Sequence, residues 1–173
     1  EQKKNEIKNF ESKTAGAKHK GGETGGISVK GVDNLLIRLS KCCNPVPGDE
    51  IVGFITKGRG VSVHRADCSN IRSMSDEERQ RFIEVEWDTE KQSRSFETDI
   101  SLLAEDRKGL FADISKICED MDVHITGVMG KSNSDNTAQF TITVQISNVN
   151  QIAQLIRRLK SMEGMIEIHR GNS

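Results

Sequence analysis

Three of the chain's four cysteines lie between residues 42 and 68, and this cluster constrains the fold more than any other feature. Cys42 and Cys43 are adjacent, and adjacent side chains on a strand point to opposite faces. Both thiols can therefore reach one ion only if the backbone turns at this point. Residues 44–48 contain both prolines and end on a glycine, which supplies the required turn, because proline fixes φ and glycine accepts positive φ.

The chain between the cysteines predicts a β-hairpin. Two β-rich runs, residues 51–56 and 61–64, flank the glycine-containing residues 57–60. The hairpin ends on His64, and Cys68 follows on a turn into a short helix that Asp67 or Ser69 could cap. The four polar side chains that converge have the Cys3His composition of structural zinc sites, and they are Cys42, Cys43, His64 and Cys68.

Two other interpretations of the cysteines remain open. A cysteine pair also occurs as two small buried hydrophobic residues. A Cys–His nucleophile is the third alternative, for which Asp67 is the only obvious orienting acid. The sequence has no stretch of roughly 18 apolar residues and no signal-peptide pattern, so we expect no membrane association and a reducing cytoplasmic location. Clustered cysteines in that location are typical of metal ligation or catalysis rather than disulfides.

Composition favours two small domains over one large core. Only 34% of the 173 residues are hydrophobic, and tyrosine is absent. Small domains bury a poor fraction of their surface, so at least one should need a cross-link or a partner. The net charge of −1 argues against non-specific nucleic-acid binding by the whole chain. The sequence does not begin with Met, which indicates a fragment of a longer protein.

The predicted organisation is a linker, a cysteine domain, a second linker and a second domain. Residues 1–26 are rich in Gly, Lys and Thr and cannot bury enough apolar area to fold, which predicts a flexible linker. The alternative is that their lysines bind RNA phosphates. The cysteine domain covers residues 27–88, residues 89–93 form a short linker, and the second domain covers residues 94–171.

Positive charge gathers on the predicted hairpin loop and after it. The basic side chains are Lys57, Arg59, Arg65 and Arg72. A solvated turn explains them, but Gly58 and Gly60 also allow a close backbone approach, so an RNA-phosphate contact is the sharper interpretation. Ser75 and Glu78 have capping-box spacing, which predicts a helix to about Phe82, followed by a strand over residues 83–88.

The second domain shows the periodicity of a ferredoxin-like βαββαβ unit, so the fold class is α+β. Strands are predicted over residues 96–102, 123–129, 137–147 and 165–169. One helix is predicted over residues 110–121, with Asp106 placed to cap it, and a second helix is predicted from Asn148 onward. Cys118 lies on the apolar stripe of the first helix, which indicates a core position. An RNA-binding version needs exposed aromatic residues for base stacking, whereas Phe96 and Phe140 both fit the core face.

The loop before the first helix of this domain suggests a ligand. Gly109 at the start of that helix leaves backbone N–H groups that can hold a carboxylate, which favours an amino acid. A plain helix N-terminus is the alternative.

With these residues assembled, the chain resembles the C-terminal regulatory half of long RelA/SpoT-homologue (Rel) proteins of the Gram-positive type, which make and degrade the alarmone (p)ppGpp. The resemblance covers residues 29–171. Its most specific signatures are residues 31–35, 40–49, 53–60 and 63–68. The second domain resembles an ACT domain, including the loop over residues 106–110.

The resemblance implies a function for each domain. Residues 27–88 would be the conserved-cysteine zinc-finger or ribosome-intersubunit domain, whose zinc ligands match the four residues above. The family docks this module and the ACT domain on ribosomal RNA around an uncharged tRNA in the A site. Rel-type ACT domains are implicated in sensing branched-chain amino acids such as valine and isoleucine, and ACT domains elsewhere bind amino acids at a homodimer interface. The matching ligand positions are Asp106, Arg107, Gly109, Leu110, Val123, His124 and Ile125.

Two departures shape the expected function. None of the four histidines is followed by Asp, and no synthetase segment is present, so we expect a non-catalytic fragment that controls catalytic domains upstream. His124 stands where many amino-acid-binding ACT domains carry Asn. The alternative function is a stand-alone amino-acid-binding ACT dimerisation module with a structural zinc finger.

Overall fold

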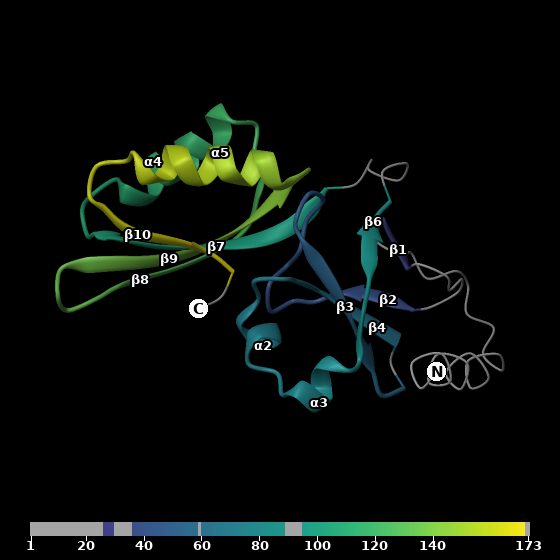
Figure 1. The fold of residues 1–173 in the computed structure, drawn as a ribbon. Helices are drawn as coiled ribbons and strands as arrows, with labels where there is room; N and C mark the ends of the chain where they lie inside the picture. The colour runs from purple at the N-terminus through teal and green to yellow at the C-terminus, as the bar shows by residue number, and fades with distance from the viewer. Residues whose placement is uncertain (1–25, 30–35, 59, 89–94, 172–173) are drawn as a thin grey trace. The chain divides into compact units, whose positions relative to one another are not determined.

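The computed structural model describes residues 26–29, 36–58, 60–88 and 95–171, which form two compact units (Figure 1). The first unit takes the described residues of Glu1–Lys41 and Glu50–Gln92, and the second takes those of Cys42–Asp49 and Ser93–Ser173. The predicted linkers at 1–26 and 89–93 lie outside the described residues except for Gly26, as do Arg59 and the signature at 31–35.

Short strands build the first unit. They are β1 (Ile27–Val29), β2 (Ile37–Leu39), β3 (Ile51–Thr56), β4 (Gly60–Arg65), β5 (Phe82–Ile83) and β6 (Val85–Trp87). Four of them form a sheet in the order β2-β4-β3-β5, and β1 pairs with β6. The predicted hairpin is confirmed, because β3 and β4 are antiparallel neighbours with Thr56 opposite Gly60. The single strand predicted over residues 83–88 is interrupted at Glu84, since β5 pairs with β3 whereas β6 pairs with β1.

The buried cluster that the described residues of the first unit form is small. Its buried members are Ile27, Val61, Val63 and Val85. Gly53 on β3 lies against this core, where an added Cβ would meet the Val85 side chain at 2.7 Å. Only a residue without a side chain fits at this position. The core is therefore closely packed around Gly53.

The described part of the first unit also contains two four-residue helices, and both differ in part from expectation. Helix α2 (Ser69–Arg72) has Cys68 as its N-cap residue, so neither Asp67 nor Ser69 caps it. Helix α3 (Asp76–Arg79) has the predicted capping box between Ser75 and Glu78. It ends before Phe82, because Phe82 pairs with Phe54 in the sheet.

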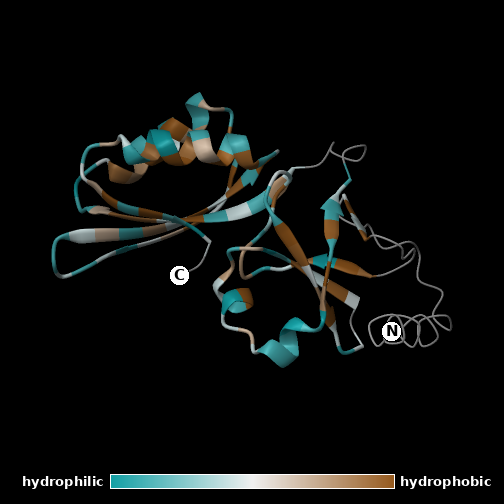
Figure 2. Ribbon diagram, viewed as in Figure 1, coloured by the Kyte–Doolittle hydropathy of each residue, from teal (hydrophilic) through white to brown (hydrophobic). Residues whose placement is uncertain are grey.

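The second unit confirms the predicted βαββαβ order. Its elements are β7 (Phe96–Glu105), α4 (Leu110–Asp120), β8 (Ile125–Ser132), β9 (Thr137–Ile146), α5 (Val149–Lys160) and β10 (Met165–Arg170). The strands form an antiparallel sheet in the order β10-β7-β9-β8. Both helices lie on one face of this sheet (Figure 1), and both carry apolar residues among polar ones (Figure 2).

The helix-covered face of the sheet carries the core of the second unit. Alternate residues of β7 are buried, and Ile100, Ile142 and Leu155 are completely inaccessible to solvent. Helix α5 begins directly after Asn148, close to the predicted start, and Asn148 caps it by accepting a hydrogen bond from the backbone N–H of Gln151. No helix in the described part of the chain has the length and apolar character needed to cross a membrane.

The predicted cap of α4 is wrong. Gly109, in the left-handed region at φ 83°, is the N-cap of this helix. The backbone N–H of Asp106 instead donates to the carbonyl of Asn136, which ties Asp106 to the turn between β8 and β9. The helix therefore begins without a side-chain cap.

Candidate metal centre

The structure brings the four predicted metal ligands together. Cys42 and Cys43 follow β2, His64 lies near the end of β4, and Cys68 is the N-cap of α2. Their sulfur and imidazole nitrogen atoms all lie within 4.8 Å of one another. Cys43, His64 and Cys68 are buried and Cys42 is half-buried, so the cluster is largely closed to solvent.

The two adjacent cysteines place their sulfur atoms close enough to bind one ion. The Sγ atoms of Cys42 and Cys43 lie 3.9 Å apart. Two thiolates in tetrahedral coordination at about 2.3 Å from zinc are separated by about 3.8 Å. Residues 41–43 form a turn, so the two adjacent side chains do not alternate as they would on a strand, and Asn44, with φ of 41°, continues the change of direction. This donor set and spacing fit zinc.

His64 is held in a form suited to ligation. Burial removes water from the ring and lowers the pKa of His64, which favours the neutral imidazole that binds metals. The Oγ atom of Ser62, two residues earlier on the same strand face, lies 3.2 Å from Nε2 of His64. A hydroxyl at this distance orients the ring, as the outer partners of metal-bound histidines do.

Cys118 contrasts with the clustered cysteines. It lies on α4, is 1% exposed, and belongs to the core of the second unit, as predicted. Burial raises the pKa of its thiol to about 11. A thiol that stays protonated is neither a nucleophile nor a metal ligand at neutral pH.

The basic residues predicted to contact RNA occupy different places. Lys57 is exposed at the turn between β3 and β4, and Arg59 lies outside the described residues. Arg65 lies at the other end of β4, where it pairs with Ile51 of β3. At a rise of about 3.3 Å per residue, it is about 17 Å from the hairpin turn. Its guanidinium pairs with Asp67, whereas Arg72 is exposed at the end of α2.

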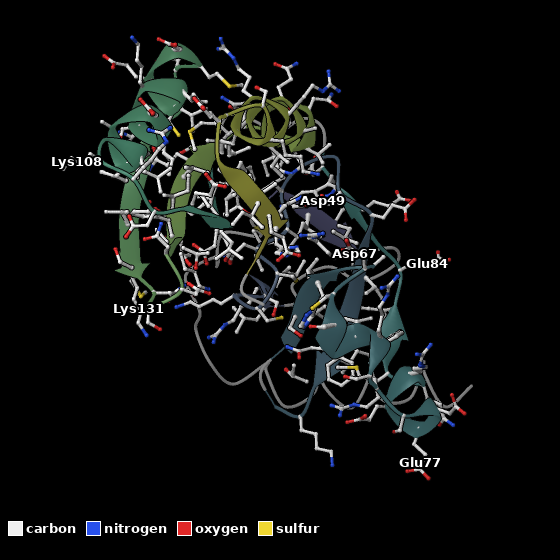
Figure 3. The ribbon with its side chains drawn as sticks, turned by 90° about the vertical axis from the view of Figure 1, so that its left-hand side faces the viewer. Asp49, Asp67, Glu77, Glu84, Lys108 and Lys131 are labelled. Carbon is white, nitrogen blue, oxygen red and sulfur yellow. The ribbon has the colours of Figure 1, made fainter. Side chains whose placement is uncertain are left out.

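The predicted amino-acid ligands form two groups at opposite ends of α4. Asp106, Arg107 and Gly109 precede this helix and Leu110 is its first residue, whereas residues 123–125 follow it. The 11 residues of the helix span about 16 Å. In the first group, Arg107 forms an ion pair of 2.7 Å with Asp113, and Lys108 projects outward (Figure 3). In the second group, Val123 is buried and His124 is exposed. One chain therefore does not gather all seven residues.

Sequence reasoning missed the side chains that hold the cysteine loop. Arg170 forms an ion pair with Asp49, and its Nη2 also donates to the carbonyl of Asn44. No local pattern marks this arginine, because Asp49 lies 121 residues earlier in the chain. An aspartate inside the 40–49 signature was the one available signal.

The chain matches two family models, described as the RelA/SpoT RIS domain over residues 27–88 and the ACT domain over residues 92–170. The GTP pyrophosphokinase of Streptomyces coelicolor is 35% identical over 94% of this chain and 19% of its own length. That of Escherichia coli K12 is 33% identical over 95% of this chain and 22% of its own length.

The chain thus spans about a fifth of these relatives. Among solved structures, the ACT domain from GTP pyrophosphokinase of Chlorobium tepidum is 18% identical, with a TM-score of 0.40 over 44% of this chain and 99% of that one. The two family models and the relatives agree with each other and with the order of elements in the structure. The chain therefore belongs to the RelA/SpoT family, in which it corresponds to the RIS and ACT domains of the C-terminal regulatory region.

Proposed function

We propose that this chain is a non-catalytic sensor that reports the state of the ribosome to catalytic domains elsewhere in a GTP pyrophosphokinase/(p)ppGpp hydrolase. The observation that carries the proposal is the closed Cys3His cluster inside the residues that match a RIS domain. Such a cluster makes a rigid docking module out of a segment with a small core. Its partners are then ribosomal RNA and the A-site tRNA.

Zinc is the metal that the cluster would hold, through Cys42, Cys43, His64 and Cys68. When bound, it supplies folding free energy and no reaction chemistry. The chain's own residues do the rest: the turn over residues 41–43 brings the two thiols together, and Ser62 orients the imidazole. Metal analysis of protein purified without chelator should give about one zinc per chain. A metal-free chain of equal stability would contradict the assignment.

Contact with RNA is assigned to Lys57, Arg59, Arg65 and Arg72. Lys57 is exposed at the hairpin turn, where Gly58 leaves open space for a phosphate. Arg65 is already paired with Asp67, so we expect its contribution to be smaller. The double variant Lys57→Glu/Arg59→Glu should weaken ribosome association and reduce the slope of log affinity against log salt by about 2, one unit per lost phosphate contact.

A matched control for charge reversal is Lys116→Glu, on the exposed side of α4. This variant should leave the affinity and the salt slope near those of the unmodified chain. Ribosome association that is the same in the hairpin variant and in the control would remove the hairpin from the interface.

A second candidate function is branched-chain amino-acid sensing by an ACT homodimer. The uncapped start of α4 at Gly109 offers backbone N–H groups of the kind that hold carboxylates. Because the two groups of predicted ligands lie at opposite ends of α4, a site made from both needs a second copy of the chain. Edge strand β8 exposes Val128 and Met129, an apolar surface suited to such an interface.

Calorimetry and light scattering test this second function together. Valine or isoleucine should bind with measurable heat to a dimer, and Gly109→Leu or His124→Ala should weaken that binding. A matched control is Lys160→Ala, exposed at the end of α5 and outside both ligand groups and β8. A monomer that gives no heat and no thermal shift with any branched-chain amino acid would exclude it.

A further inference from the structure

The loop Cys42–Asp49 carries two of the four metal ligands, and it packs into the second unit. Val46 at its centre is completely buried, and its two prolines are buried as well. The carbonyl of Pro47 accepts a hydrogen bond of 2.9 Å from the backbone N–H of Val149, the first residue of α5. The loop is therefore shaped by contacts of the second unit as well as by its own turn residues.

One side chain holds both ends of the segment that follows the cysteines. Nη1 and Nη2 of Arg170 contact the two carboxylate oxygens of Asp49 at 2.7 and 2.6 Å. Nη2 also donates to the carbonyl oxygen of Asn44 at 3.1 Å. The side chains of Arg170 and Asp49 are 9% and 8% exposed, so solvent screens this two-pronged pair little.

The other contacts of this cluster fix the same atoms. Asp49 accepts a hydrogen bond of 2.7 Å from the backbone N–H of Val46, and Nε of Arg170 lies 3.4 Å from Oγ1 of the buried Thr98. The side-chain amide of Asn44 donates to Asp99 on β7 at 3.3 Å. Because Asn44 directly follows Cys43, this network sets where the chain leaves the metal ligands.

We propose that Arg170 is a positioning residue for the metal site, since it holds the loop that presents the sulfur atoms of Cys42 and Cys43. The inference rests on the proposed zinc function. Groups outside the ligand shell that orient metal ligands change metal affinity by about 10- to 100-fold when they are removed. Arg170 acts one residue beyond the ligands, because it contacts the carbonyl of Asn44, which follows Cys43, and the carboxylate of Asp49.

The test uses the whole chain and the variant Arg170→Met, which keeps an apolar stem and removes the guanidinium. We expect zinc to be released to a chromophoric chelator about 10- to 100-fold faster than from the unmodified chain. In the cobalt-substituted chain, the thiolate-to-cobalt and d–d absorption bands should shift, because they report the geometry around the ion. Arg170→Lys keeps the charge and loses the fork, so it should give an intermediate rate.

The control separates positioning from general destabilisation. Ile114→Ala removes a fully buried side chain of α4 in the same unit, at a position outside the Arg170 network. It should change zinc release by less than about twofold, while lowering the thermal midpoint of the second unit by about 10 °C or more. If Ile114→Ala accelerates release as much as Arg170→Met, or if neither variant changes it, the inference is wrong.

The same experiment distinguishes this inference from the function on which it rests. An unmodified chain that contains no zinc overturns both. An unmodified chain with one zinc, combined with an Arg170→Lys or Arg170→Met variant of unchanged release rate and cobalt spectrum, overturns the positioning role alone. Should Arg170→Met fail to fold, the lysine variant provides the decisive rate.

Discussion

The two units differ in how much of their stability comes from an apolar core. In its described residues, the first unit has helices of four residues and a small cluster of buried residues around Val61 and Val63. The second has strands of ten residues, helices of 11 and 12 residues, and completely inaccessible core residues such as Ile100 and Leu155. A small core leaves little free energy after conformational entropy is subtracted, so the first unit should depend on a cross-link that the second does not need.

Metal removal should separate the two units most strongly. Structural zinc in small domains contributes an apparent 10–16 kcal/mol or so, which exceeds the stability of a typical domain. In the variant Cys68→Ser, or after chelation, the amides of β3 and β4 should exchange with deuterium freely, whereas those of β7 and β9 stay protected. Hydrogen-exchange mass spectrometry measures both regions in one sample.

The control for this loss is Cys118→Ala, which removes a cysteine that is not in the cluster. This variant should keep about one zinc per chain and leave β3 and β4 protected. Equal protection of β3 and β4 in metal-free and metal-loaded protein would show that the first unit does not depend on the cluster.

A cavity in the second unit should produce the reverse pattern. Leu155→Ala removes a completely buried side chain of α5 and should cost about 2–5 kcal/mol, because the surrounding core collapses only in part. Urea unfolding of the variant should show that loss in the transition of the second unit, with zinc content unchanged. A uniform loss in both transitions would mean that the two units unfold as one.

The same difference explains which parts of the fold could be predicted. In the second unit, long amphipathic elements repeat their apolar residues often enough that the βαββαβ order and the start of α5 near Asn148 could be predicted. In the first unit, the β3–β4 hairpin and the Ser75 capping box were predictable from local chemistry. The pairing of β1 with β6 was not, because it joins residues far apart in the chain.

The candidate metal site was predictable as a set of ligands, but its support was not. The residue types and the predicted turn were enough to identify the ligands Cys42, Cys43, His64 and Cys68. The contact of Arg170 with Asp49 depends on how the chain end returns to the loop, and no local pattern encodes that return. The predicted cap of α4 was wrong for a similar reason. The backbone N–H of Asp106 donates to the carbonyl of Asn136, a contact between distant parts of the chain that no local pattern encodes.

Overpacking should also distinguish the units, by a smaller amount. In Gly53→Ala the new Cβ would meet Val85 and Ile83 at 2.7 and 2.8 Å, so we expect a cost of about 1–3 kcal/mol in the first unit. The matched change in the second unit is Gly127→Ala, whose nearest neighbour is the Thr143 hydroxyl at 3.3 Å. It should cost less than about 1 kcal/mol. Denaturant midpoints of zinc-loaded protein would reveal the difference, and equal costs would contradict it.

Helix caps give the smallest expected difference between the units. Asn148 caps α5, a 12-residue helix that buries Ile152, Leu155 and Leu159, so fraying of its first turn exposes core. Asn148→Ala should therefore cost about 1 kcal/mol in the unfolding of the second unit. Ser75 caps α3, a four-residue helix without a buried residue, so Ser75→Ala should melt that turn locally and cost less than about 0.5 kcal/mol. If thermal unfolding shows the Ser75 variant to be the less stable of the two, α3 contributes more to the first unit than its burial indicates.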